Sequence, residues 1–169
     1  MKIGSNCELI GSFPGERLPL YNNLRILVLS NSFTNNGVNL IPWTIPTQIG
    51  SLSSLELFIL SEAEKLVGSI PNEIGMLQNL QDLQLSFNDL TGSLPTQMSN
   101  MISLTALRIN WNNLIGPIPV GFASLPALEV LELIYNSLTG KIPWSNNETN
   151  SMNNDSIIKQ LNLVRINWN

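Results

Sequence analysis

A pattern of 24 residues recurs in the middle of the chain, and this regularity constrains the fold more than any other feature. The copies span residues 70–92, 94–116 and 118–140, so each begins 24 residues after the one before. Self-similarity at one short period is the signature of a solenoid, in which each unit buries its apolar edge only against its neighbours. The sequence therefore predicts a stack of repeated coils.

Each copy contains a short segment in which apolar and polar residues alternate. In the first copy, Leu83 and Leu85 alternate with Asp82, Gln84 and Ser86. A period of two is expected of a strand with one buried face. Each coil thus supplies one strand to a parallel sheet, and equivalent residues of successive coils form columns about 4.8 Å apart.

An asparagine follows each of these strands. The asparagine column comprises Asn88, Asn112, Asn136 and, at the last residue of the sequence, Asn169. An inward asparagine can pair the backbone of a turn, since its amide both donates and accepts hydrogen bonds. We therefore interpret this column as a structural ladder. A glycine that permits positive φ and an Ile-Pro or Leu-Pro pair with fixed φ come next in each copy.

The full pattern, L-x-x-L-x-L-x-x-N-x-L followed by L-x-G-x-I-P, resembles the plant-type subfamily of leucine-rich repeats. The resemblance implies an α/β repeat solenoid, a curved right-handed superhelix. Its parallel β-sheet would lie on the concave face, with short 3₁₀, helical or irregular segments on the convex face. Similar repeats occur in the ectodomains of receptor-like kinases and receptor-like proteins, and in polygalacturonase inhibitors.

The resemblance covers nearly the whole chain, which we interpret as one domain spanning residues 1–169. Its units are a partial repeat (1–12), an irregular repeat (13–44), four repeats (45–69, 70–93, 94–117 and 118–141) and a partial repeat with an inserted loop (142–169). Both ends fall inside a repeat and carry no capping unit, although an uncapped solenoid exposes apolar core. We therefore expect a fragment of a longer protein.

Composition argues against several classes of function. The chain has no His, and its eight Lys and Arg residues are scattered. The absence of His removes the common nucleophile triads and His-containing zinc sites, and no glycine-rich phosphate-binding motif occurs. Nucleic-acid binding requires a basic stripe that this chain lacks. We expect no catalytic residue, no metal and no cofactor.

The sequence leaves the compartment open. No run approaches the roughly 18 apolar residues of a membrane helix, and residues 1–11 lack the apolar region of a signal peptide. The single Cys7 cannot form an internal disulfide. The resemblance implies an extracellular or membrane-attached location as part of a longer chain.

The open face of the strands is the usual ligand surface of similar repeats, so its outward columns supply the candidate binding residues. Between the two strand leucines lie Gln84, Arg108, Glu132 and Arg165, and the next column contains Ser86 and Asn110. The charges of Arg108, Glu132 and Arg165 alternate in sign. They can hold a charged ligand, or they can pair with one another across the sheet.

An aromatic residue precedes the ladder asparagine in four successive repeats. These residues are Phe87, Trp111, Tyr135 and Trp168. An exposed aromatic column suits sugar rings or an extended peptide, because rigid rings give contact area at little entropic cost. Alternatively, neighbouring rings stack and stiffen the sheet, as cross-strand aromatic pairs do. The sequence leaves both interpretations open.

The inserted loop contains two N-x-S/T sequons, at Asn147 and Asn154, which are candidate glycosylation sites. In a chain this rich in Asn, Ser and Thr, such sequons also arise by chance, so they do not establish secretion.

We interpret the chain as a non-catalytic module that recognises a peptide, protein or glycan through the concave strand face. Two alternatives remain. The chain can be the sensor ectodomain of a receptor-like kinase whose catalytic domain lies outside it, or a structural surface repeat without a single ligand. The ligand and the oligomeric state are not indicated by the sequence.

Overall fold

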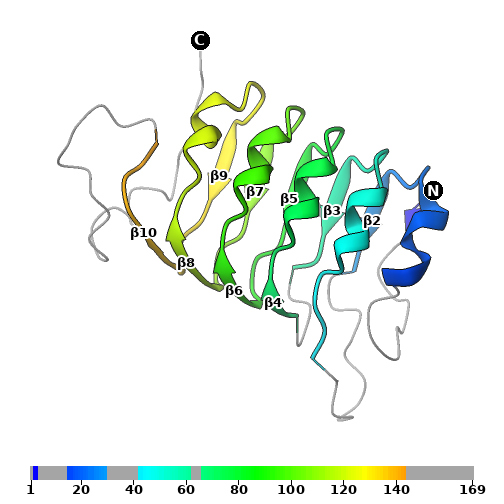
Figure 1. Ribbon diagram of the computed structural model, residues 1–169, viewed down its shortest axis with the longest axis horizontal. Helices are drawn as coiled ribbons and strands as arrows, with labels where there is room; N and C mark the ends of the chain where they lie inside the picture. Colours follow the sequence, from blue (N-terminus) through cyan, green and yellow to red (C-terminus); the bar gives the residue numbers. More distant parts are fainter. Residues whose placement is uncertain (1, 4–14, 30–41, 62–65, 144–169) are drawn as a thin grey trace.

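Coils of similar shape lie side by side along the long axis of the molecule (Figure 1). The computed structural model describes residues 2–3, 15–29, 42–61 and 66–143. Within these ranges each complete coil contains a strand, a turn, a second strand and a short 3₁₀ helix, and then the next coil begins.

Six parallel strands form the main sheet, in the order β1-β2-β3-β5-β7-β9. They are Lys2–Ile3 (β1), Ile26–Val28 (β2), Leu57–Ile59 (β3), Asp82–Gln84 (β5), Ala106–Arg108 (β7) and Val130–Glu132 (β9). The pairing places the inward residue of each strand opposite that of the next, as with Leu83, Leu107 and Leu131. The columns expected from the repeat period are therefore present.

A second sheet follows the turn after each main strand. Its four parallel strands, in the order β10-β8-β6-β4, are Val67–Ser69 (β4), Asp89–Ser93 (β6), Asn113–Pro117 (β8) and Ser137–Thr139 (β10). Gly92 and Gly116 have φ of 78° in β6 and β8. Glycine adopts this left-handed backbone without steric penalty, which lets these strands bend toward the helices.

Short 3₁₀ helices form the side of the coils away from the main sheet. They are Gly15–Tyr21 (η1), Thr47–Ser51 (η2), Asn72–Met76 (η3), Thr96–Asn100 (η4) and Val120–Ser124 (η5). Each of η2 to η5 begins directly after a proline, whose fixed φ and missing N–H suit a helix start. Among the described residues no helix is long and apolar enough to span a membrane.

The apolar core runs through the interior of the coils as one continuous cluster. Every layer contributes a buried residue in each coil: Leu83, Leu107 and Leu131 from the main sheet, Leu90, Leu114 and Leu138 from the second sheet, and Ile74, Met98 and Phe122 from the helices. Full burial of such a side chain contributes about 1.5–3 kcal/mol. The predicted repeat solenoid, with parallel strands and short 3₁₀ segments, is confirmed for the described residues.

Candidate ligand-binding surface

The outward residues of β2, β3, β5, β7 and β9 form one continuous surface, which we call the sheet face. Two columns cross it. One contains Ile26, Leu57, Asp82, Ala106 and Val130, and the other contains Val28, Ile59, Gln84, Arg108 and Glu132. The outward residues on β2 and β3 are all apolar, whereas those on β5, β7 and β9 are polar or charged except for Ala106 and Val130. The sheet face thus has an apolar half and a polar half.

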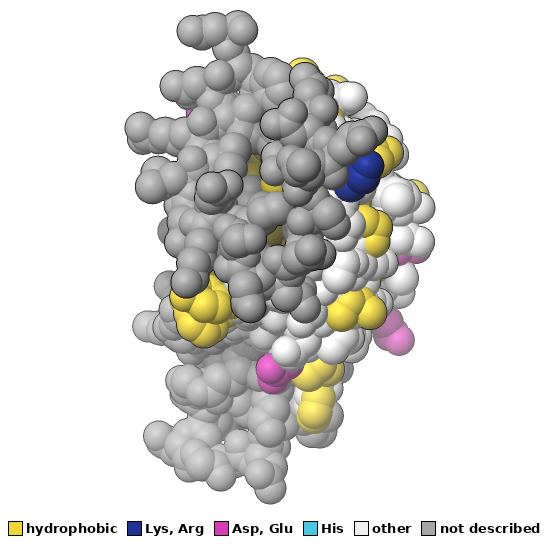
Figure 2. All heavy atoms as spheres, turned by 90° about the vertical axis from the view of Figure 1, so that its left-hand side faces the viewer, with side chains coloured by type: hydrophobic (Ala, Val, Ile, Leu, Met, Phe, Trp, Pro, Cys, Tyr) yellow, Lys and Arg dark blue, Asp and Glu magenta, His cyan; other side chains and the backbone are white. Residues whose placement is uncertain are grey.

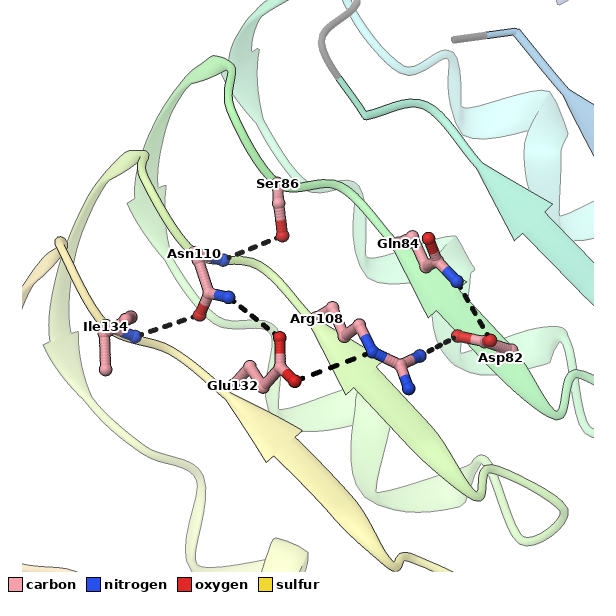
Figure 3. Close-up of polar contacts among 7 residues, drawn as sticks. All are labelled: Asp82, Gln84, Ser86, Arg108, Asn110, Glu132 and Ile134. Atoms are coloured by element: carbon pink, nitrogen blue, oxygen red, sulfur yellow. Dashed lines mark hydrogen bonds and ion pairs between the residues drawn. The ribbon is translucent and has the colours of Figure 1, made fainter. Parts of the chain in front are cut away.

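A network of polar side chains joins the strands of the polar half (Figure 3). Arg108 Nη1 donates a hydrogen bond of 2.9 Å to Asp82 Oδ1, and Gln84 Nε2 donates one of 3.0 Å to Asp82 Oδ2. Arg108 Nε lies 3.7 Å from Glu132 Oε1, an ion pair without a close hydrogen bond. Arg108 and Glu132 therefore pair across the sheet, which is one of the two interpretations that the sequence left open.

Asn110 connects the network to the turns beyond the strands. Its Nδ2 donates to Glu132 Oε2 at 2.9 Å, and its Oδ1 accepts the backbone N–H of Ile134 at 3.2 Å. These two bonds fix the orientation of the amide, because its nitrogen must donate and its oxygen must accept. The backbone N–H of Asn110 also donates to Ser86 Oγ at 3.1 Å.

Two residues differ from the expectations based on sequence. Ser86 was placed in an outward column but is buried, and its hydroxyl oxygen accepts the backbone N–H of Asn110 in the next coil. Asp82 was not among the candidates, yet it holds Arg108 and Gln84. Its position two residues before Gln84 in an alternating strand was the signal, since residues i and i+2 share a face.

The network is ordered but remains accessible. The side chains of Asp82, Arg108 and Glu132 are 28%, 31% and 40% exposed. Such part-exposed ion pairs contribute only about 0–1 kcal/mol to stability. Their clearer effect is to hold charged groups in a defined arrangement, with two carboxylates for one guanidinium.

A separate ion pair lies at the start of β2 and β3. Arg25 donates from Nε and Nη2 to the two carboxylate oxygens of Glu56, each at 2.7 Å. These hydrogen bonds lower the pKa of the Glu56 carboxyl below its ordinary value and raise the pKa of Arg25. The pair links two successive coils at the margin of the sheet face.

Three aromatic side chains form a stack beyond the strands. The ring centroids of Phe87 and Trp111 lie 5.8 Å apart and those of Trp111 and Tyr135 lie 3.7 Å apart, with interplanar angles of 14° and 20°. Their exposed fractions are 52%, 46% and 54%. Because Trp111 stacks on a ring in each neighbouring coil, its faces are directed at other rings. This geometry favours the stacking interpretation over a platform for sugars.

The aromatic column has a backbone feature that the sequence did not indicate. Phe87, Trp111 and Tyr135 have φ of 59°, 55° and 55°, a left-handed conformation that is uncommon for bulky residues. It occurs where the chain leaves the strand and turns toward the ladder asparagine. Sequence reasoning missed it because aromatic residues give no signal for a left-handed turn.

The ladder asparagines tie each coil to the one before it. Asn112 Nδ2 donates to the carbonyl of Leu85 at 2.9 Å, and its Oδ1 accepts the N–H of Leu90 at 3.0 Å. Asn136 repeats this arrangement with Ile109 and Leu114, at 2.8 and 3.1 Å. The side chain of Asn88 likewise donates to the carbonyl of Leu60, at 2.8 Å. These bonds pair backbone groups that a turn would otherwise leave unsatisfied.

Several candidates lie outside the described residues. They are Arg165 of the charged column, Trp168 of the aromatic column, Asn169 of the ladder and the sequon residues Asn147 and Asn154.

Other surfaces of the described chain carry fewer groups that could bind a ligand. Within the described ranges, no three or more Cys, Asp or Glu residues are grouped so that they could hold a metal ion. An open cavity of about 280 Å³ lies between η3 and η4, on the helical side, lined by residues that include Glu73, Met76 and Gln97. Seen from the β10 end, the described surface is mostly hydrophobic or uncharged, with few charged side chains (Figure 2).

Comparison with known proteins agrees with this architecture. Residues 79–101 and 103–125 match the family model described as Leucine Rich Repeat. A search of curated proteins found no match.

Solved structures give longer matches. The plant peptide hormone receptor RGFR1 in complex with RGF2 is 37% identical with a TM-score of 0.68, over 79% of this chain and 20% of that chain. The ectodomain of the Arabidopsis thaliana membrane receptor kinase GASSHO1/SCHENGEN3, in complex with CASPARIAN STRIP INTEGRITY FACTOR 2, is 35% identical with a TM-score of 0.64, over 80% and 18%. A plant ice-binding protein is 32% identical with a TM-score of 0.66, over 85% and 44%.

The fold and these matches define the class of protein: the chain is a leucine-rich repeat solenoid. Its repeats are of the plant type, as the L-x-G-x-I-P pattern predicted, and they are similar to those of plant receptor ectodomains. The chain spans 20% and 18% of the two receptor chains described above.

Proposed function

We propose that the chain is a non-catalytic recognition module that binds a peptide or a protein through the sheet face. The polar network on β5, β7 and β9 is the observation that carries this proposal. Its side chains are held in place by one another, yet Asp82, Arg108 and Glu132 remain 28–40% exposed. The apolar core lies on the other side of the sheet and does not need them.

The similar receptors support a biological setting for this activity. Two of them were solved with RGF2 and with CASPARIAN STRIP INTEGRITY FACTOR 2. In our proposal the chain acts likewise as the sensing part of a longer extracellular or membrane-attached protein. A kinase or another effector would then lie in a different part of that protein.

The test introduces a lysine on each of the two sheets in turn and compares the effects on peptide affinity. A phage-displayed library of random dodecapeptides is selected against the chain, and enriched peptides are measured for affinity. We expect Gln84→Lys, on the sheet face, to weaken binding about tenfold or more, because a new cation disturbs the contacts around Asp82. Thr91→Lys, on β6 of the second sheet, should leave the affinity unchanged.

Two results would contradict the proposal. Equal effects of both variants would mean that the sheet face is not the binding surface. A library without any enriched peptide would favour a structural surface repeat, or a glycan ligand, over peptide recognition.

The second sheet supports a second candidate function, ice binding. Val67, Thr91, Ile115 and Thr139 recur every 24 residues on its strands, flanked by serines and an asparagine. Apart from Asp89, the outward side chains of these four strands are uncharged, and they present methyl and hydroxyl groups to water in an array that repeats about every 4.8 Å from strand to strand. The similarity to a plant ice-binding protein makes this arrangement worth testing.

The same two variants separate this candidate from the first. If the second sheet binds ice, the chain slows ice recrystallisation, Thr91→Lys abolishes that effect, and Gln84→Lys preserves it. A chain that leaves the growth of ice crystals unchanged would exclude this candidate.

A further inference from the structure

The cavity of about 280 Å³ between η3 and η4 is separate from the sheet face and lies outside the proposed function. The two helices are neighbours on the side of the coils away from the main sheet (Figure 1). They approach closely at Gly75, which lines the cavity and where a Cβ atom would clash with the backbone of Gln97. The helices on either side, η2 and η5, also belong to the described part of the chain.

Amide side chains dominate the lining of this cavity. Four amides and one carboxylate line it, from Asn72, Gln78, Gln97, Asn100 and Glu73. Within the described ranges, four of these five side chains form no hydrogen bond or ion pair, and Gln97 accepts one hydrogen bond from the neighbouring Thr96. Most of their donors and acceptors are therefore available to a ligand.

The repeat itself does not require these side chains. One coil later, the residues equivalent to Gln97 and Asn100 are the smaller Gly121 and Ser124. The buried residues of the same helices, in contrast, are apolar in every coil, as with Ile74, Met98 and Phe122. The amide lining is thus a property of this one gap between helices, whereas the packing beneath it is common to the coils.

The chemistry of the lining favours a ligand with several hydroxyl groups. An amide donates from its nitrogen and accepts at its oxygen, a carboxylate only accepts, and a hydroxyl group does both. Among the described residues no Lys or Arg lines the cavity, and Glu73 adds a negative charge, so an anionic ligand is disfavoured. Met76, which is 63% exposed, supplies an apolar contact beside the polar groups.

We infer that the cavity between η3 and η4 binds one unit of a neutral oligosaccharide. Glu73 accepts hydrogen bonds from hydroxyl groups of the sugar, amides from both helices pair with its other hydroxyl groups, and Met76 contacts the apolar side of the ring. The volume of about 280 Å³ is close to the lower limit of about 300 Å³ for small-molecule sites, which suits a single ring. Because the cavity is open, the rest of the oligosaccharide extends into solvent.

The test follows the methyl groups of isotope-labelled methionines by NMR. Met76 lines the cavity, whereas Met98 and Met101 are fully buried and serve as internal references. Cellotriose, mannotriose and galactotriose are titrated separately into the millimolar range. At least one of them should shift the Met76 resonance and leave the two buried methionines unchanged. Trigalacturonic acid, in which each galactose unit carries a carboxylate, should bind more weakly than that sugar.

Glu73→Ala removes the carboxylate and should weaken the affinity about tenfold or more. Glu16→Ala is the matched control, since it makes the same substitution at an exposed site on η1, which is separated from η3 by η2. It should leave the affinity unchanged, as should Gln84→Lys on the sheet face. Unchanged resonances of Met98 and Met101 show that each variant remains folded.

Three results would overturn the inference. They are a Met76 resonance that no neutral sugar shifts, an affinity that Glu73→Ala leaves unchanged, and tighter binding of trigalacturonic acid than of every neutral sugar. None of them bears on peptide recognition by the sheet face, which Gln84→Lys tests separately.

Discussion

Bulky residues rarely adopt a left-handed backbone, yet one column of this solenoid places three aromatic residues there. Phe87, Trp111 and Tyr135 have φ between 55° and 59°, a conformation that costs roughly 1–2 kcal/mol for an ordinary residue. Stacking of the rings offsets part of that cost, since an aromatic pair contributes about 0.5–1.5 kcal/mol beyond its buried area. At these positions the left-handed backbone therefore destabilises the fold, while the stacked rings stabilise it.

This opposition predicts an unusual order of stability at Trp111. Trp111→Ala loses both ring contacts and keeps the unfavourable φ of 55°. Trp111→Gly loses the same contacts but relieves the backbone, so it should be more stable than Trp111→Ala by several tenths of a kcal/mol or more. Urea unfolding of both variants provides the measurement. The opposite order would mean that the strain is negligible.

The ladder asparagines give a second prediction at the residue scale. Asn112 is 7% exposed and pairs the N–H of Leu90 and the carbonyl of Leu85. Asn112→Ala should lower the free energy of unfolding by about 1–3 kcal/mol, because the N–H of Leu90 loses its partner, whereas the carbonyl of Leu85 keeps the hydrogen bond from Asn88. The adjacent, exposed Asn113→Ala should stay within about 0.5 kcal/mol. Similar losses in both variants would argue against a structural ladder.

At the scale of strands and helices, the repeat period made most of the architecture predictable. Alternation around Leu83 located the strands, because it acts through local backbone geometry, and the resemblance to plant-type repeats implied the short 3₁₀ segments. The polar network was less predictable. The hydrogen bond from Arg108 to Asp82 depends on rotamers and strand register, and the hydroxyl of Ser86 is paired with a backbone N–H of the next coil. Neither of these two interactions can be predicted from residues that are adjacent in the sequence.

The close approach of η3 to η4 depends on Gly75. A Cβ atom at Gly75 in η3 would clash with the backbone of Gln97 in η4, which cannot move without shifting the helix. Gly75→Ala should therefore lower the stability by about 1–3 kcal/mol, as overpacked interiors do. Chemical denaturation measures this loss. An unchanged unfolding midpoint would show that the helical side can open by several tenths of an ångström at little cost.

The link between β2 and β3 should depend on pH. The pKa of Glu56 is lowered by its hydrogen bonds to Arg25, so the pair stabilises the fold above the pKa that Glu56 has when unfolded, about 4.3. This contribution disappears as the pH falls through the lower, folded pKa. Stability measured at successive pH values should thus decline more steeply at acid pH in the unmodified chain than in Glu56→Gln. Parallel curves would contradict a native pair.

For the whole molecule, stability arises from contacts between neighbouring coils. Leu107 is fully buried in a central coil, with Leu83 and Leu131 in the adjacent strands. A cavity at this point weakens packing toward both sides. The sheet face is built differently, because its residues vary from coil to coil while the core residues repeat. This separation explains why the sequence predicted the repeat solenoid of the described residues but not the ligand.

Leu107→Ala should therefore lower the free energy of unfolding by roughly 2–5 kcal/mol. Hydrogen exchange should show the loss of protection in β5 and β9 as well as in β7. Trp111→Ala, with its ring 46% exposed, should cost less. Comparable losses from the two variants would mean that the aromatic stack is part of the core.

The asparagine ladder has a consequence for how such a surface can evolve. Each ladder side chain completes the hydrogen bonds of the preceding coil, as Asn112 does for Leu90 and Asn136 for Leu114. An in-frame duplication of one 24-residue unit would add both a ladder asparagine and the backbone groups to which the asparagine of the next unit bonds. The sheet face can therefore grow or shrink in steps of one strand spacing, about 4.8 Å. Gene duplication alone would then change the length of ligand that the molecule can accommodate, without any redesign of its core.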